Sequence, residues 1–215
     1  MADRLATGRP LFPERVDAGA LVLREYVESD APAVVEAVTA NLEHLRPWMP
    51  WIAHEPMSVA DRVALIRFWR GELRAGTNAI YGIFLDDDLI GGTGYHVRNG
   101  PGVVEIGYWL RHDHTGQGFA TTSSRALTDH AFTIEGIDRV EIHHDVANRR
   151  SEAVPTRLGF RHVRDEVRAP QAPAETGVMR IWQMTADHWV PGRSGASGAL
   201  RSRAEGWQSG RLRRS

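Results

Sequence analysis

The sequence of 215 residues contains no cysteine, which excludes disulfides, thiolate metal sites and an acyl-cysteine intermediate. It also contains no lysine, because all 26 basic residues are arginine. Schiff-base chemistry and a Walker-type phosphate loop both need a lysine amine, so neither is available. No run of about 18 apolar residues is present to span a membrane, and the N-terminus carries no charged-then-apolar signal segment. We therefore expect a cytoplasmic protein.

Charge is unevenly distributed along the chain, although the net charge is only −1. Residues 193–215 hold six arginines and one glutamate, and the rest of the chain holds 20 basic and 26 acidic residues. Glycine and serine are frequent in this tail, which favours a disordered extension without specific nucleic-acid binding. We expect an N-terminal extension over 1–18, one domain over 19–190 and a disordered basic tail over 191–215.

Hydrophobic periodicity predicts a mixed α/β domain of order βααβββαβαββ. Strands are expected at 20–26, 79–85, 89–97, 102–110, 138–146, 159–167 and 177–185, and helices at 28–45, 57–76, 118–132 and 151–158. Ser29 or Asp30 would cap the first helix, and Ser58 would begin the second as part of a capping box. Between 79 and 110, the acidic turn and short connections favour an antiparallel meander.

A strand-to-helix junction at residues 105–127 contains two closely spaced glycines, Gly116 and Gly118. The first turn of a helix offers unpaired N–H groups and the positive end of the helix dipole, so the segment Thr115–Thr121 is a candidate phosphate site. A dinucleotide-binding turn would need glycine where Thr121 stands, and a P-loop would need lysine. A plain helix start, whose glycines serve only the turn, is the remaining alternative.

Three segments together resemble the GNAT N-acetyltransferases, over about residues 19–187. The sequence Thr115-Gly116-Gln117-Gly118-Phe119-Ala120 resembles the acyl-CoA-binding pattern Gln/Arg-x-x-Gly-x-Gly/Ala of that family. The residues Asn148, Ser151, Leu158, Gly159 and Phe160 resemble its Asn-x-x-Ser...Leu-Gly-Phe signature. The segment 41–51 (NLEHLRPWMPW) resembles the helix-to-helix turn of the RimJ/RimL-type subgroup, which acetylates protein N-terminal amines and some small amines.

The resemblance implies a mixed, mostly antiparallel twisted sheet, flanked by helices, whose strands splay around an acyl-CoA site. Backbone N–H groups of Thr115–Thr121 would hold the diphosphate, Trp109 and Leu110 would pair by backbone with the pantetheine arm, and Asn148 would contact the cofactor from the other side. Thr115 departs from the family pattern, where Gln or Arg is usual. Because threonine still has an N–H and a hydroxyl to offer, we expect weaker binding of acetyl-CoA, not its loss.

Acyl transfer needs a neutral amine and a protonated leaving thiolate. Glu105, in the strand that leads to the glycine junction, is the candidate base acting through water, unless it is only a solvated strand residue. Ser151 matches the serine proposed as the acid in RimL-type enzymes, and it could also be the N-cap of its helix. With no cysteine and no Gly-x-Ser-x-Gly elbow, direct transfer in a ternary complex is expected.

The acceptor side is marked by Trp48 and Trp51, which lie in a proline-bounded aromatic turn. The resemblance implies that they line the amine cleft together with the loop at 169–175, whereas tryptophans in general often cap a core. Metal binding is not expected. The pair His143/His144 would point to opposite faces of a strand, and His112/His114 lack a further ligand at recognisable spacing.

We therefore expect the chain to be an acyltransferase that moves an acetyl, or another short acyl group such as succinyl, from coenzyme A to a primary amine of a protein N-terminus or a small molecule. A non-catalytic acyl-CoA sensor or interaction module is the alternative, and a nucleotide-binding enzyme is the second. The resemblance leaves a homodimer open, because dimers are common in that family.

Overall fold

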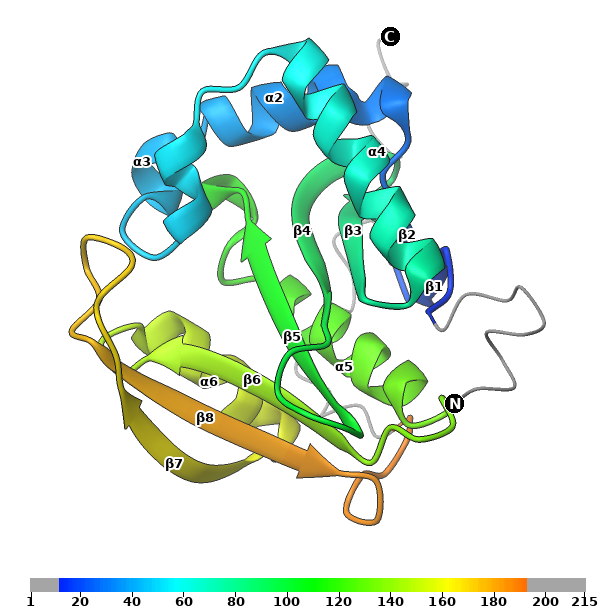
Figure 1. Ribbon diagram of the computed structural model, residues 1–215, viewed down its shortest axis with the longest axis vertical. Coiled ribbons are helices and arrows are strands. Elements are labelled where there is room, and N and C mark those ends of the chain that lie inside the picture. The colour runs from blue at the N-terminus through cyan, green and yellow to red at the C-terminus, as the bar shows by residue number, and fades with distance from the viewer. Residues whose placement is uncertain (1–11, 193–215) are drawn as a thin grey trace, which may run out of the picture.

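The computed structural model describes residues 12–192, and its centre is an eight-stranded sheet with the order β1-β2-β3-β4-β5-β6-β8-β7 (Figure 1). The strands are β1 (Arg15–Ala18), β2 (Leu21–Glu25), β3 (Asn78–Leu85), β4 (Asp88–His96), β5 (Val103–Leu110), β6 (Arg139–Asp145), β7 (Arg161–Val167) and β8 (Val178–Thr185). Neighbouring strands are antiparallel except β5 and β6, which run parallel. The mixed, mostly antiparallel sheet predicted from the sequence is therefore confirmed.

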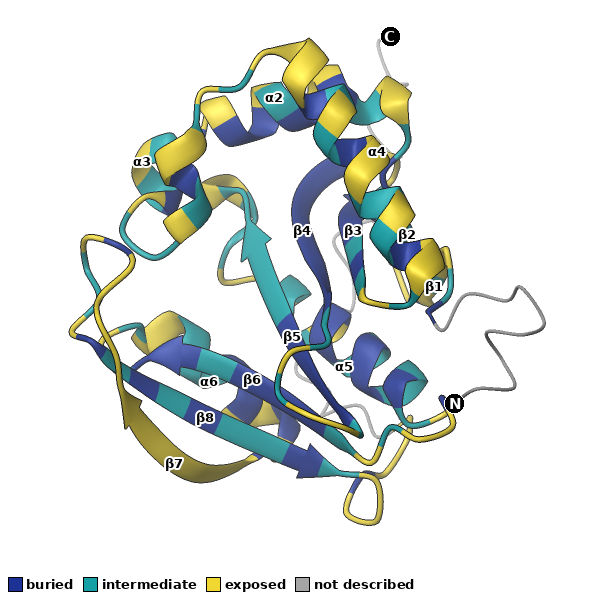
Figure 2. Cartoon of the chain, viewed as in Figure 1, coloured by how far each residue is buried: buried dark blue, intermediate teal, exposed yellow. Residues whose placement is uncertain are grey.

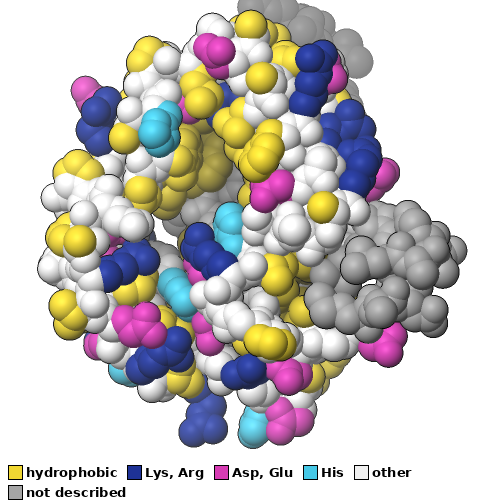
Figure 3. Space-filling model, viewed as in Figure 1, with side chains coloured by type: hydrophobic (Ala, Val, Ile, Leu, Met, Phe, Trp, Pro, Cys, Tyr) yellow, Lys and Arg dark blue, Asp and Glu magenta, His cyan; other side chains and the backbone are white. Residues whose placement is uncertain are grey.

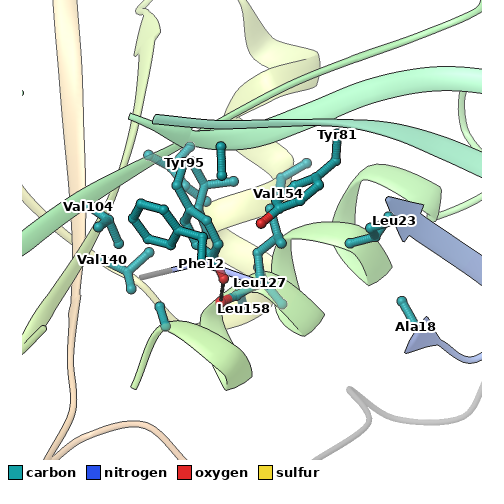
Figure 4. Packing of buried hydrophobic residues seen from close by; sticks show 14 of the residues in the cluster. Phe12, Ala18, Leu23, Tyr81, Tyr95, Val104, Leu127, Val140, Val154 and Leu158 are labelled. Carbon is teal, nitrogen blue, oxygen red and sulfur yellow. Dashed lines mark hydrogen bonds between the residues drawn. The ribbon is translucent and has the colours of Figure 1, made fainter. Parts of the chain in front are cut away.

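Helices cover both faces of the sheet. They are α2 (Ala31–Thr39), α3 (Leu42–Leu45), α4 (Val59–Ala75), α5 (Phe119–Ala131) and α6 (Arg149–Leu158), with 3-10 turns η1 (Glu28–Asp30), η2 (Pro50–His54) and η3 (His112–His114). Figure 1 shows α2 and α4 in front of the sheet and α5 and α6 behind it. Side chains that are buried against α5 and α6 form the larger core, in which the Tyr95 hydroxyl donates to the Leu127 carbonyl of α5 (Figure 4).

The sheet begins earlier than the sequence analysis expects, because β1 lies inside the segment assigned to the N-terminal extension. It pairs antiparallel with β2 through a two-residue turn at Gly19, whose φ of 68° is in the left-handed region. Phe12 is fully buried and stacks on Tyr95 at a centroid distance of 4.8 Å. A four-residue strand is too short for its periodicity to be visible in the sequence. The basic tail, from residue 193, lies outside the described residues.

The helix predicted over 28–45 is divided into η1, α2 and α3. Asn41 stands at the break, where its amide donates to the Ala37 carbonyl and its side-chain oxygen accepts the His112 N–H. Asparagine favours such breaks because its side chain competes for backbone groups. Asp30 precedes α2 without capping it by its side chain, whereas Ser58 caps α4 as predicted, accepting the Asp61 N–H at 3.1 Å.

The parallel pair β5 and β6 opens into a fork. Residues Val103–Glu105 of β5 pair with residues Arg139–Glu141 of β6, and beyond these pairs the two strands diverge. Over the described residues, the facing edges of 106–110 and 142–145 form no pairs with each other. Backbone N–H and C=O groups of both strands are therefore open to an extended ligand in the fork.

The alternation of side chains along β5 separates the two sides of the fork. Ile106 belongs to the core with α5 and α6, and Trp109 packs against the core with α2 and α4. Glu105 shares the side of Trp109, and Tyr108 shares the side of Ile106. Figure 2 shows the buried lower half of β5 leading into the half-buried stretch that borders the fork, as well as the fully exposed edge strand β7.

Candidate active site

The glycine junction forms an open ring of backbone donors at the start of α5. Gly116 and Gly118 have φ of 75° and 86°, in the left-handed region that favours glycine, and no atom lies within 4 Å of a Cβ built at either position. Among the described residues, none of the six N–H groups from Gly116 to Thr121 has a hydrogen-bond partner, whereas the Thr122 N–H donates to the Gly118 carbonyl. The positive φ angles favour glycine at both positions, and the turn leaves unpaired donors of the kind that bind anions at helix starts.

Thr115 does not contribute as expected. Its N–H and its hydroxyl both donate to the His112 carbonyl, at 3.2 and 2.8 Å, so neither is free for a phosphate. The next side chain that could help, Gln117, donates to the Asp113 carbonyl at 3.1 Å. Phe119 packs its ring on the core and leaves only its N–H at the junction. The available donors therefore begin at Gly116 and belong to the main chain.

Ser151 lies across the fork from Tyr108 and does not cap its helix. The N-cap of α6 is Asn148, whose side-chain oxygen accepts the Ser151 N–H at 3.1 Å. The Ser151 hydroxyl instead lies 2.9 Å from the Tyr108 hydroxyl. Burial raises the pKa of Tyr108, and the Ser151 hydrogen bond opposes this only in part, so the phenol stays protonated at neutral pH. The N-cap alternative for Ser151 is thereby corrected, because its side chain bonds to Tyr108 and not to the backbone N–H groups of α6.

Glu105 is buried at the vertex of the fork and makes contacts through both of its oxygens. Arg98 donates to Oε2 at 2.9 Å and to Oε1 at 2.5 Å, and the Asn99 amide donates to Oε2 at 3.1 Å. Nδ1 of His143 lies 3.3 Å from Oε2. Burial raises the pKa of Glu105, but the Arg98 hydrogen bond, the charges of His143 and Arg98, and the Asn99 hydrogen bond together hold it below its ordinary value. Glu105 is thus a firmly held anion and not a solvated strand residue.

The groups around Glu105 were not predicted from the sequence, and two of them lie on β6. Glu141 is its register partner on β6, and Nε2 of His143 lies 2.7 Å from Oε2 of Glu141. From the sequence, His143 stands out only as half of a possible metal-binding pair with His144. Strand alternation offers the missing signal, because Glu141 and His143 are two residues apart and so share a face. Within 12–192, no group of three or more Asp, Glu or His side chains is arranged to hold a metal ion.

The aromatic turn and the following loop are the parts that the sequence predicts to line an acceptor cleft. Figure 3 shows the surface hollowed between the helical part and the β6–β8 part, with hydrophobic side chains inside. Trp51 packs on Trp109 with ring centroids 5.9 Å apart and also against the smaller core, as the core-capping alternative expects, and its part in an amine cleft stays a prediction. Trp48 is half-buried in the same turn. The Ala174 N–H donates to the Pro47 carbonyl at 3.0 Å, which joins the 168–177 loop to this turn.

A separate pocket of about 370 Å³ lies between α2 and the turn that contains η3. Its charged lining residues are Glu36, Asp88, Arg111 and Asp113, and Arg111 pairs with the two aspartates at 3.0 and 2.8 Å. Because three carboxylates face one arginine that is already paired, the pocket offers less to an anion than the N–H groups of the junction.

A parallel strand pair that opens into a fork, with unpaired N–H groups at the start of the following helix, is suited to an extended thioester carrier with a diphosphate. A model of the family described as "Acetyltransferase (GNAT) domain" matches residues 20–161, and the chain belongs to this family. It is an N-acetyltransferase with acetyl-CoA as co-substrate. No helix in the described part of the chain is long and apolar enough to cross a membrane.

Comparisons with individual proteins agree with the family. The Bacillus subtilis (strain 168) protein named "Putative ribosomal N-acetyltransferase YdaF" is 30% identical over 142 residues, which are 65% of this chain and 77% of that protein. The structure of Mycobacterium smegmatis RimJ in complex with CoA-disulfide is 27% identical, with a TM-score of 0.72 over 83% of this chain and 90% of that chain. A structure of RimL in complex with coenzyme A has a TM-score of 0.74 at 24% identity, over 80% of this chain and 98% of that chain.

Proposed function

We propose that this enzyme acetylates the α-amine of a protein N-terminus, in the cytoplasm, by direct transfer in a ternary complex. The single observation that carries the proposal is the two-sided fork. The unpaired N–H groups of Gly116–Thr121 follow the diverging end of β5, and a hollow in the surface lies between the helical part and the β6–β8 part (Figure 3). The relatives named as ribosomal-protein acetyltransferases support a protein N-terminus as acceptor.

The low basicity of Glu105 fits an α-amine as acceptor. An α-amine with a pKa of about 7.7–8.0 is roughly one-tenth neutral at pH 7, whereas a lysine amine near 10.4 is neutral only a few times in ten thousand. Glu105, with its lowered pKa, is a weak base, which suffices for the α-amine and not for lysine. We assign to Glu105 the removal of the amine proton through a water, and to Ser151 the protonation of the leaving thiolate.

The hollow supports an extended acceptor. We assign the rim of the acceptor site to the aromatic turn at Trp51 and to the 168–177 loop, which is tied to that turn through the hydrogen bond from Ala174 to Pro47. An extended peptide could enter from this side with its N-terminus at the vertex. A small amine would use the vertex alone and would depend less on Trp51.

The test uses two peptides of one sequence that contains a single lysine, one with a free N-terminus and one with an acetylated N-terminus. With acetyl-CoA, we expect thiol release from the first and none above background from the second. Mass spectrometry should place the new acetyl group on the terminal nitrogen. Acetylation of the lysine in both peptides would contradict the assignment of the acceptor.

A further inference from the structure

We propose that Arg98 occupies, in the free enzyme, the place on Glu105 that the ammonium group of the acceptor takes, and that the acceptor binds by displacing it. The inference rests on the acyl transfer proposed above and names a residue that controls how the acceptor reaches the base. It follows from the contacts of the two Glu105 oxygens and from the exposure of the arginine that holds them.

Glu105 is a buried carboxylate whose cationic partner remains in water. Only 7% of the Glu105 side chain is exposed, against 60% of the Arg98 side chain. Arg98 belongs to the turn between β4 and β5, and within residues 12–192 the hydrogen bonds of its side chain all go to Glu105. A buried carboxylate needs a cation beside it, whereas an exposed guanidinium stays hydrated without a carboxylate. Arg98 can therefore leave when another cation takes its place.

The two oxygens of Glu105 are held in different ways. Among the described residues, Oε1 accepts only from Nη2 of Arg98, at 2.5 Å. Oε2 accepts from Nε of Arg98 at 2.9 Å and from the Asn99 amide at 3.1 Å, and Nδ1 of His143 lies 3.3 Å from it. Departure of Arg98 would thus free Oε1, while Asn99 and His143 keep Oε2 in place. The carboxylate stays positioned and offers one oxygen to the acceptor.

Glu141, the register partner of Glu105, is held without an exposed cation. Its Oε2 lies 2.7 Å from Nε2 of His143 and 3.1 Å from the Asn99 amide, and its Oε1 accepts from the Gln183 amide at 3.2 Å. The side chain of His143 is only 13% exposed. None of these partners is an exposed cation that an acceptor could replace, so we assign the exchange to Glu105 alone.

The sheet leaves room for an amine beside Glu105. Residues two apart on a strand share a face, so the neighbour of Glu105 toward the fork is Gly107, which has no side chain. Trp109 follows on the same face and packs on Trp51 of the aromatic turn. His96 of β4 borders the space, because a Cβ at Gly107 would lie 3.3 Å from its Nε2. A primary amine that enters over Gly107 would reach the Glu105 carboxylate.

The exchange conserves charge at Glu105. A primary ammonium group carries the same single positive charge as Arg98 and has three hydrogens to donate. The buried carboxylate is therefore compensated while the charged acceptor is bound. Once Glu105 has taken a proton from the acceptor it is neutral, and it no longer needs a cation. An uncharged group cannot compensate Glu105 and so cannot displace Arg98, which makes a cationic primary amine the preferred occupant.

The first test measures binding by calorimetric titration in the presence of coenzyme A. It compares an acceptor peptide with its desamino form, in which hydrogen replaces the terminal amine. Arg98→Ala should bind the free-amine peptide about tenfold more tightly than wild type does, because no side chain competes for Glu105. It should bind the desamino peptide no better. The KM for the free-amine peptide should fall by a similar factor.

Arg70→Ala is the matched control. Arg70 also pairs through two nitrogens with a buried carboxylate, at 3.1 and 3.2 Å from Glu25, but this pair joins α4 to β2 and lies beyond β3 and β4 from the fork. It should bind both peptides like wild type.

Two results of this titration would overturn the proposal. An unchanged or weaker affinity of Arg98→Ala for the free-amine peptide would show that Arg98 is only a structural partner of Glu105. A gain that the desamino peptide shares equally would show that Arg98 obstructs the cleft only by its bulk.

A second measurement does not depend on the identity of the acceptor. Ethylammonium chloride should raise the Tm of Arg98→Ala by about 3 °C relative to sodium chloride at the same concentration, and it should affect wild type less. The double variant Arg98→Ala/Glu105→Gln should not distinguish the two salts. A Tm of Arg98→Ala that is equal in both salts would overturn the proposal. A specific response, together with no thiol release from any amine, would support the ammonium site and refute the proposed function instead.

Discussion

Tyr108 of β5 and Ser151 of α6 connect the two sides of the fork through hydroxyl oxygens 2.9 Å apart. The Tyr108 hydroxyl also lies 3.1 Å from the Ser151 carbonyl and can donate to it. Because the phenol has only one hydrogen to donate, a Tyr108 that donates to the carbonyl accepts the hydrogen bond from the Ser151 hydroxyl. The pair thus fixes the orientation of Ser151 beside the open strand edges.

Ser151→Ala should slow turnover without weakening the binding of acetyl-CoA. The leaving thiolate loses its proton donor, and the expected decrease in kcat is about 100-fold. Single-turnover kinetics and calorimetric titration measure the two quantities separately. Tyr108→Phe is the comparison variant and should lose less, because Ser151 keeps its own hydroxyl. If Ser151→Ala turns over at the wild-type rate, Ser151 has no role as an acid.

Gly118→Ala should weaken the binding of coenzyme A, and Gly136→Ala supplies a matched control. Both glycines have nearly the same positive φ, 86° and 85°, and open space around a Cβ. Each substitution should therefore lower the free energy of unfolding by a similar amount, about 1–2 kcal/mol. Only Gly118→Ala should also raise the Kd for coenzyme A, by about tenfold, because it disturbs the unpaired N–H groups. Equal Kd values in the two variants would argue against the junction as the diphosphate site.

Glu105→Gln should lower kcat, with the largest relative loss at low pH, where an ammonium acceptor depends most on a base. Glutamine keeps the shape of the side chain, and Arg98 stays solvated because 60% of its side chain is exposed. The acceptor should be varied from an α-amine to a more acidic amine, which is neutral without help. The loss should shrink with the more acidic amine. A loss that is the same for both acceptors and at every pH would point to a purely structural role.

The individual signals of the site could be predicted from the sequence because each is local. Each of three features can be recognised from its immediate neighbours in the sequence. They are the glycine spacing at 116–118, the acidic residue Glu105 that precedes it, and Ser151 in its own signature. Likewise, Ser58 could be recognised as a helix cap from its neighbours, and the cap was confirmed.

The pairings between these segments could not be predicted, because they depend on the register of β5 against β6. Glu141 and His143 join Glu105 only through the parallel pairing, across 36 residues of chain. Tyr108 meets Ser151 only because α6 begins across the fork. The role of Thr115 could not be predicted either. Its N–H and hydroxyl donate to the His112 carbonyl of a 3-10 turn that the sequence does not indicate.

Asp145 at the end of β6 should make the stability of the fold depend on pH in the acid range. Its carboxylate accepts the N–H groups of Ala147, Thr176 and Gly177 and the Thr176 hydroxyl. Burial raises the pKa of Asp145, but these hydrogen bonds outweigh burial and lower it. A lowered folded-state pKa gives a contribution that is full above the unfolded value of about 3.9 and is lost as the pH falls through the folded value.

Asp145→Asn should therefore lower the unfolding free energy by about 1–2 kcal/mol at pH 7, and the difference from wild type should vanish in strong acid. Denaturant titrations at several pH values measure it. The exposed Asp17, paired with Arg15, gives the control Asp17→Asn, for which little change is expected. A deficit of Asp145→Asn that persists unchanged in strong acid would contradict the role of the ionised carboxylate.

The most direct test of the account is a crystal structure with acetyl-CoA bound. We predict diphosphate oxygens within hydrogen-bond distance of the N–H groups between Gly116 and Thr121, and a pantetheine arm paired with the open edge of β5 in the fork. A bound acetyl-CoA with its diphosphate elsewhere and these N–H groups open to solvent would contradict the account.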